Sequence, residues 1–245
     1  MLSAPGWHAG LAPALLGGGE PASVRSTLVA RRFRTLGWAT TGGVVAGAAL
    51  GLLVIVSWDI EPETVSGDAA AADFVAAWDR SLRGTYYVAS EFHRTTPNGN
   101  LDSVHELARR PPDVVRRQFG GLAGRIGDHP IMCSTDPDEQ VSCIRGDVEL
   151  DPYEESVEDE VARWDDYFDG QVPLYRVETR GDGCFDLTLT QMFPAPPYGR
   201  YARFCFDDAT GAIVYSEIRK DEGTDVQEAI EVRSAVTDAD FALPE

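Results

Sequence analysis

Two stretches, RFCFDDATGAIVYSEI at residues 203–218 and CFDLTLT at residues 184–190, decide the fold of this chain. In both, apolar and polar residues alternate, which is the period of a β-strand with one buried face. An Asp-Asp-Ala-Thr-Gly segment after Cys205 is typical of a turn. The two runs can therefore be laid antiparallel, as neighbouring strands of one sheet.

The cysteines in these runs allow the register to be tested. Placing Cys184 opposite Cys205 also sets Asp186 opposite Arg203, so opposite charges face each other as a stable ladder requires. Four cysteines allow three pairings, and this register favours one of them. The predicted disulfides are Cys133–Cys143 and Cys184–Cys205. Disulfides persist in oxidising compartments, so we expect this part of the chain to fold outside the cytoplasm.

An uncharged run, WATTGGVVAGAALGLLVIVSW, lies nearer the N-terminus. It is long enough to cross about 30 Å of hydrocarbon at about 1.5 Å per residue. Arginines precede it and acidic residues follow it, which predicts a cytoplasmic N-terminus and an extracytoplasmic C-terminal domain at the cell membrane. We expect a disordered cytoplasmic tail over residues 1–35, a single transmembrane helix over 36–58, a linker over 59–69 and the extracytoplasmic domain over 70–245.

A cleaved signal peptide is the alternative reading of the same run. The apolar core of a signal peptide is usually about 7 to 15 residues long, shorter than this run. The sequence SWDIEP that follows is a poor cleavage site, although AAAAD further on is a second candidate. An uncleaved anchor is the interpretation that we carry forward.

Glycines recur every four residues within the apolar run, at Gly43, Gly47 and Gly51. Such a GxxxGxxxG ridge lets two helices approach closely, which predicts packing as a homodimer or with a membrane partner. The alternative is that a composition rich in alanine and glycine places small residues at every position.

Formal charge divides at the end of the apolar run. Residues 1–58 carry +3, so the total of −19 leaves −22 on residues 59–245. A domain this acidic is a poor partner for nucleic acid or for anionic membrane surfaces. Lys220 is the single lysine against twenty arginines, a composition typical of a GC-rich bacterial genome such as that of an actinobacterium.

Two amphipathic helices are expected in the outer domain, over residues 69–84 and 151–170. The second has Asp151 as its predicted N-cap and Gly170 as its predicted stop. Alternating segments elsewhere predict strands over 85–95, 101–108, 113–119, 174–180, 184–190, 200–206, 211–219 and 225–237, with short strands around the first two cysteines.

Motifs of known enzyme chemistry do not occur in the sequence. It has no G-x-S-x-G, H-E-x-x-H, P-loop or C-x-x-C pattern. His93, His105 and His129 lack the spacing of metal ligands, and the acidic segment DPDEQ lacks the glycine and closing glutamate of a calcium loop. We therefore expect a binding protein rather than an enzyme, without a cofactor or a metal ion.

Four arginines, Arg109, Arg110, Arg116 and Arg117, form a basic cluster around Pro111-Pro112 in this acidic domain. They are candidates for docking an acidic partner or the domain's own acidic helix. The simpler alternative is that they are solvated surface charges.

Several segments together resemble the LolA-like lipoprotein-carrier superfamily, which includes the N-terminal domain of the RseB/MucB regulators and mycobacterial lipid-binding lipoproteins. The segments are FVAAWDRSLRGTYYV, ARRPPDVVRR, FCFDDATGAIVYSEI and DADFALPE. The resemblance implies an α+β fold, a curved antiparallel half-barrel whose helices cover an apolar cavity for acyl chains. The residues that it would place in the cavity are Phe74, Trp78, Val88, Phe92, Leu187 and Leu189. An ordinary closed core would use the same residues.

A fixed anchor separates this chain from carriers that shuttle between membranes. The sequence therefore predicts a membrane-anchored extracytoplasmic binding protein for a hydrophobic ligand or lipoprotein acyl chains, in envelope lipid handling. The alternative is an extracytoplasmic regulatory or sensor module that binds a membrane signalling partner, as the RseB-like resemblance implies.

Overall fold

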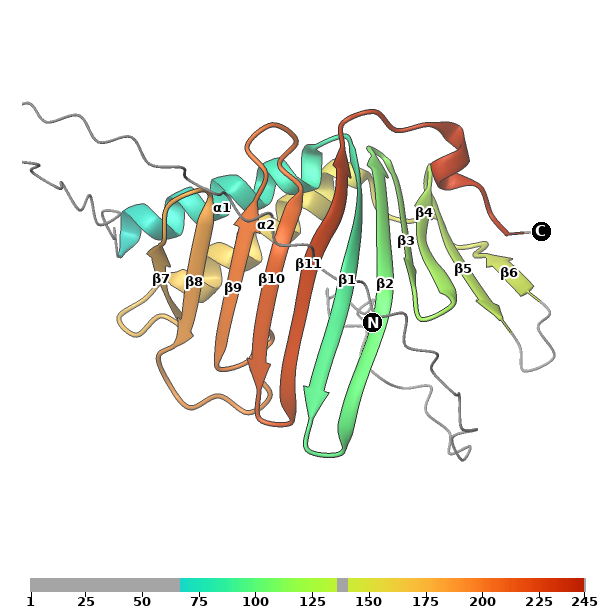
Figure 1. The fold of residues 1–245 in the computed structure, drawn as a ribbon. Helices are drawn as coiled ribbons and strands as arrows, with labels where there is room; N and C mark the ends of the chain where they lie inside the picture. Colours follow the sequence, from blue (N-terminus) through green and yellow to red (C-terminus); the bar gives the residue numbers. More distant parts are fainter. Residues whose placement is uncertain (1–66, 136–140, 245) are drawn as a thin grey trace, which may run out of the picture. The chain divides into compact units, whose positions relative to one another are not determined.

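The computed structural model of the protein describes residues 67–135 and 141–244. The expected tail, transmembrane helix and linker residues up to 66, with Gly43, Gly47 and Gly51, lie outside the described residues, and their structure stays a prediction. None of the described helices has the length and apolar content that a membrane span needs. The described residues form an open antiparallel sheet of 11 strands with two α-helices (Figure 1), so the α+β class is as predicted.

The helices and strands follow the chain as two meanders separated by a helix. The helices are α1 (Asp68–Arg83), α2 (Tyr153–Phe168) and the short 3₁₀ helix η1 (Asp238–Phe241). The strands are β1 (Tyr86–Thr96), β2 (Gly99–Arg110), β3 (Asp113–Gln118), β4 (Gly121–Ile126), β5 (His129–Thr135), β6 (Val141–Arg145), β7 (Tyr175–Thr179), β8 (Cys184–Leu189), β9 (Tyr201–Phe206), β10 (Ile213–Lys220) and β11 (Gly223–Arg233). Because β11 pairs with β1, the two meanders join into one sheet.

The predicted register between the two opening stretches is confirmed. Strands β8 and β9 pair antiparallel, with Cys184 opposite Cys205 and Asp186 opposite Arg203. A disulfide joins the first pair. In the other meander Cys133 lies opposite Cys143 across β5 and β6, and the second disulfide joins them.

One face of the sheet packs against the helices, and we call it the helix face. Both helices lie across the β7–β11 half of the sheet in Figure 1. Phe74 of α1 is fully buried and contacts Trp164 of α2, with ring centroids 4.7 Å apart. Beneath them lie apolar side chains of β7, β8 and β9, among them Leu187 and Phe204. Burial of such large side chains stabilises this layer by about 1.5–3 kcal/mol each.

The other face, which we call the strap face, has its apolar core at the opposite end of the sheet. Alternation along β1 sends Tyr87 and Ala89 to this side, where they join Val115 and Leu122. Phe241 of η1 covers them and is 6% exposed. We call residues 234–244, which carry η1, the C-terminal strap.

The ends of the helices are set by tertiary contacts. Helix α1 stops at Gly84, as predicted, where a Cβ atom would lie 2.7 Å from the Thr210 carbonyl oxygen. The prediction of Asp151 as the N-cap of α2 is wrong: Pro152 occupies the cap position, and no side chain caps the helix. Instead the Asp151 carbonyl accepts a hydrogen bond from Arg125 Nη2 at 3.1 Å, which fixes the chain before the helix.

Candidate functional site

The residues predicted to line a ligand cavity lie in three places. Phe74, Trp78 and Leu187 belong to the aromatic cluster between the helices and strands β7–β9, and they are 0%, 5% and 0% exposed. Leu189 packs against the edge of the same cluster. The structure therefore brings four of the six residues together, in a layer where side chains are already in contact.

The other two predicted cavity residues lie further along β1 on the helix face. Val88 belongs to a small separate cluster with Tyr86 and Ala212. Phe92 stacks on His105 with ring centroids 4.5 Å apart, and the ring of Phe119 meets both of them edge-on. The helix face thus continues beyond the aromatic cluster as a second apolar area.

Two buried donors in the aromatic cluster have no acceptor. The indole N–H groups of Trp78 and Trp164 are buried without a hydrogen-bond partner, and the ring centroids lie 4.9 Å apart. Each unpaired buried donor costs about 1–3 kcal/mol. The neighbouring Tyr175 is satisfied, because its hydroxyl donates to the Gly199 carbonyl and accepts from the Tyr198 amide, both at 3.1 Å. Burial raises the pKa of Tyr175 to about 12.

The basic cluster around Pro111-Pro112 divides between the two faces of the sheet. On the strap face, Arg117 donates to the carbonyl oxygens of Asp240 and Ala242, and Arg110 pairs with Asp238 at 2.8 Å while lying over the Phe241 ring. Two of the four arginines therefore hold the C-terminal strap against the sheet.

Arg109 points to the helix face and holds the two helices to the sheet. It is 8% exposed, and its Nη1 donates to the Leu82 carbonyl and to the Tyr153 hydroxyl, both at 2.9 Å. Tyr153 also donates to the Leu82 carbonyl. One arginine of the four thus docks α2, through a tyrosine hydroxyl rather than through the acidic face of that helix. The Nε of Arg109 is buried and has no acceptor.

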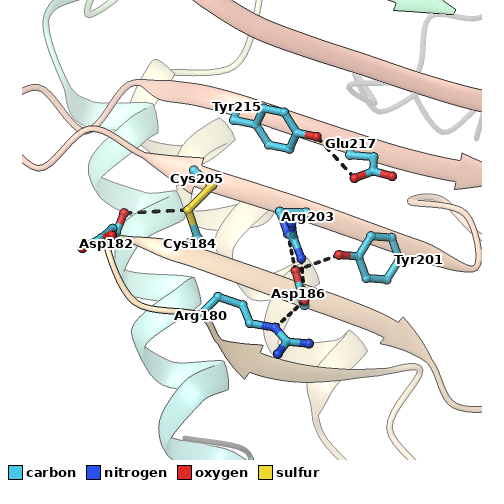
Figure 2. Close-up of a disulfide and its surroundings, with 9 residues drawn as sticks. All are labelled: Arg180, Asp182, Cys184, Asp186, Tyr201, Arg203, Cys205, Tyr215 and Glu217. Carbon is cyan, nitrogen blue, oxygen red and sulfur yellow. Dashed lines mark hydrogen bonds and ion pairs between the residues drawn. A yellow bond between two sulfur atoms is a disulfide. The ribbon is translucent and has the colours of Figure 1, made fainter. Parts of the chain in front are cut away.

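Asp186 organises a polar network on the strap face of β8 and β9 (Figure 2). The carboxylate is 3% exposed and accepts hydrogen bonds from Arg180 and Arg203, each at 2.6 Å, and from Tyr201 at 2.9 Å. Burial alone would raise the pKa of Asp186, but these donors outweigh it and hold that pKa below its usual range. The charge pairing of Asp186 with Arg203 was predictable, whereas Arg180 gave no signal in the sequence because it lies in a loop.

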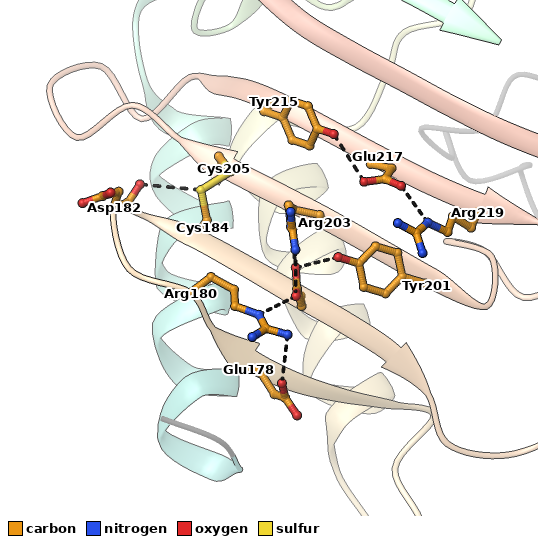
Figure 3. Close-up of polar contacts among 11 residues, drawn as sticks. Glu178, Arg180, Asp182, Cys184, Tyr201, Arg203, Cys205, Tyr215, Glu217 and Arg219 are labelled. Atoms are coloured by element: carbon orange, nitrogen blue, oxygen red, sulfur yellow. Dashed lines mark hydrogen bonds and ion pairs between the residues drawn. A yellow bond between two sulfur atoms is a disulfide. The ribbon is translucent and has the colours of Figure 1, made fainter. Parts of the chain in front are cut away.

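The network extends to neighbouring ion pairs, and all of its cations are compensated (Figure 3). Arg180 lies 3.6 Å from Glu178, and Arg219 pairs with Glu217 at 2.6 Å. An open hollow of about 640 Å³ lies beside the Cys184–Cys205 disulfide on this face. Because carboxylates pair with its arginines, this network favours a role in stabilising the hairpin over binding an external anion.

The histidines do not converge on a site. His93 contacts Asp102, His105 is buried under aromatic rings, and His129 lies at the start of β5. Among the residues that the structure describes, no three side chains of the metal-binding kinds come together.

Comparison with known proteins gives similar structures but no sequence match. No protein-family model and no curated protein matches the chain. Solved structures similar to it include a LolA superfamily protein from Nitrosomonas europaea, at 10% identity over 71% of this chain and 97% of that chain, with a TM-score of 0.31. LprF from Mycobacterium bovis has 12% identity over 71% of this chain and 97% of that chain, with a TM-score of 0.33.

The Pseudomonas aeruginosa MucA/MucB complex is also similar in structure, with 13% identity and a TM-score of 0.37. The similarity covers 71% of this chain and 61% of the matched chain of that complex. These structures come from the LolA-like and MucB-like proteins that the sequence motifs resemble. They are similar to the chain in the arrangement of the backbone only, so the chain's ligand and partner have to be argued from its own residues.

Proposed function

We propose that the chain is a membrane-anchored, extracytoplasmic protein whose helix face binds a hydrophobic ligand bearing acyl chains. The observation that carries the proposal is the pair of acceptor-free indole N–H groups of Trp78 and Trp164, inside a cluster otherwise made of apolar side chains. Binding sites for apolar ligands have this composition, with mostly apolar walls and a few polar groups that orient the ligand.

An ester carbonyl of the ligand would accept hydrogen bonds from these donors once the helices move away from the sheet. The acyl chains would then take the place of the side chains that contact Phe74 and Leu187 when the helices lie against the sheet. Helix α2 is held to the sheet partly through Tyr153 and Arg109, at one end of the layer. The helices would therefore separate from the sheet first at the other end of the layer.

Quenching of tryptophan fluorescence by dibromostearate tests this proposal in the full-length chain. The variant W7F/W38F/W58F leaves Trp78 and Trp164 as the emitters. Saturable quenching at micromolar dibromostearate, reversed by unbrominated stearate, supports a ligand beside these rings. Emission that responds no more than free tryptophan does would overturn the proposal.

A second candidate function is binding of a protein partner in a regulatory role. The loops around β7 and β8 favour it, because Val172, Met192 and Phe193 are 60%, 95% and 46% exposed. Clustered apolar side chains at a surface often mark a site of protein contact. Photo-crosslinking from position 192 in intact cells tests this candidate. A crosslinked protein of discrete mass supports it, and recovery of lipid adducts alone contradicts it.

A further inference from the structure

Arg116 stands apart from the other arginines of the basic cluster. It lies on the helix face of β3, where it is exposed and has neither an ion-pair nor a hydrogen-bond partner within residues 67–135 and 141–244. It sits opposite Leu107 of β2, so Arg109 and His105 are its diagonal neighbours on the same face.

Positive charge accumulates here. The side chain of Arg116 reaches solvent, but protein atoms surround its guanidinium group. Their desolvation of the charge lowers the pKa of Arg116, and the positive charge of Arg109 lowers it further. Burial lowers the pKa of His105, and Arg116 adds to that effect. Arg116 would therefore gain from an anion beside it.

Arg109 supplies an independent sign of a missing acceptor. Its Nη1 is engaged by the helices, but its Nε is buried without a partner in a side chain that is only 8% exposed. A buried guanidinium N–H that lacks an acceptor is costly, because hydrogen bonds to charged groups are the stronger ones. Arg109 is the diagonal neighbour of Arg116 on this face, so both arginines lie on the same side of the sheet.

An apolar surface continues from the arginines. Val88, Leu107 and Arg116 stand in one row across β1, β2 and β3, and the row continues through Ala123 of β4 and Met132 of β5, so the cation lies within a row of apolar side chains. Val88 is 3% exposed, whereas Leu107 is half-buried and accessible. Further along the same face Phe119 is 53% exposed. The surface thus has an exposed cation with apolar side chains on both sides of it.

We propose that the arginine surface (Arg109, Arg116 and Leu107) binds a small anionic amphiphile, whose carboxylate or phosphate head group lies at the arginines and whose hydrocarbon chain lies along the sheet. The head group sits beside the exposed Arg116, on the side of Arg109, and the hydrocarbon chain follows Leu107. Binding of the hydrocarbon chain rests on the proposed function. The preference for a negatively charged head group rests on the arginines alone.

Calorimetric titration of the full-length chain in a non-ionic amphipol tests the inference with four probes. Decanoate and decanol share the chain but differ in charge, while acetate and inorganic phosphate carry the charge without the chain. We expect decanoate to bind at least about tenfold more tightly than decanol, and R116Q to remove that difference. R176Q is the matched control, because Arg176 is exposed on β7 and belongs to neither core. R116K should retain part of the preference.

Each outcome decides between the two proposals. Equal binding of decanoate and decanol, unchanged in R116Q, overturns the anion site but leaves hydrophobic binding in place. Arg116-dependent binding of acetate or phosphate that equals decanoate binding overturns the amphiphile and assigns the surface to a free anion. Absence of binding by every probe overturns both proposals. Because Arg116 is exposed, R116Q should fold, and an unchanged thermal unfolding midpoint verifies this.

Discussion

Strands β7–β10 and strands β1–β5 belong to one sheet, yet their largest apolar clusters lie on opposite faces. In the first region the helices cover the sheet, and aromatic rings such as Phe74 and Trp164 fill the space between them. In the second region the C-terminal strap covers the other face with one aromatic ring, that of Phe241. On the helix face of β2 and β3, Leu107 is consequently only half-buried and Arg116 is exposed.

The difference shows how one sheet can combine a stable core with a surface available for binding. If the helices and the C-terminal strap covered the same face of the sheet, that face would have no solvent-accessible apolar side chains. Changing the buried face after β1 keeps the C-terminal core away from the helix face. The predictions below test how separate the two regions are.

The largest effect is expected from removing the central ring of the helix-covered region. Phe74→Ala should lower the free energy of unfolding by about 3–5 kcal/mol, because the ring is fully buried and its removal leaves a cavity. The matched change Phe241→Ala should cost less, about 1–3 kcal/mol, since the strap can settle onto the sheet. Urea denaturation of both variants measures the difference. Equal losses would contradict the contrast between a filled layer and a single covering ring.

The two disulfides allow a second comparison of the regions. Cys184→Ser with Cys205→Ser opens a link between residues 21 apart, and Cys133→Ser with Cys143→Ser a link between residues 10 apart. The chain-entropy model predicts a loss of about 3 kcal/mol for each, with roughly 0.6 kcal/mol more for the longer loop. Denaturation of each double variant under non-reducing conditions checks the values. A larger loss for the shorter loop would show that chain entropy does not govern the difference.

Acid should weaken the helix-covered region through Asp186. Its pKa is lower in the folded state than in the unfolded state, so its contribution is complete above the unfolded value of about 3.9 and is lost as the pH falls below it. Asp186→Asn should cost about 1.5–3 kcal/mol at pH 7, and this cost should shrink as the pH is lowered towards 3. Denaturation midpoints of both proteins at several pH values test this. A cost independent of pH would mean that the carboxylate charge does not contribute.

The smallest effect is expected at the edge of the strap-covered region. Arg110 and Asp238 form an exposed pair, with side chains 40% and 94% exposed. Arg110→Gln should therefore lower the thermal unfolding midpoint only slightly. Thermal unfolding at low and at high salt measures it, and a large loss at both salt concentrations would mean that the stacking of Arg110 on Phe241 matters more than its charge.

Local patterns in the sequence were sufficient to predict the disulfide-linked strand pair β8 and β9. Alternation and charge pairing fixed the register of Cys184 with Cys205, because these are properties of adjacent strands. The start of α2 and the role of Arg109 could not be predicted in the same way. Both depend on contacts between residues distant in the chain, such as that of Arg109 with Leu82 and Tyr153.

The sequence also could not show that the predicted cavity residues lie in separate places. The six predicted cavity residues share an apolar character, but Leu187 lies beneath the helices while Val88 and Phe92 lie beyond them. Which strands the helices cover depends on the sheet order, in which β11 joins β1. Arg116 gave no signal of its own, because sequence cannot show which arginine of a cluster lacks a carboxylate partner.

Hydrogen–deuterium exchange of the full-length chain, with and without saturating stearate, tests most directly the claim that the helix face binds the ligand. We predict slower exchange in α1, α2 and the β2–β3 segment on adding stearate, with the C-terminal strap unchanged. Exchange that is the same throughout, or that changes only in the strap, would contradict the account.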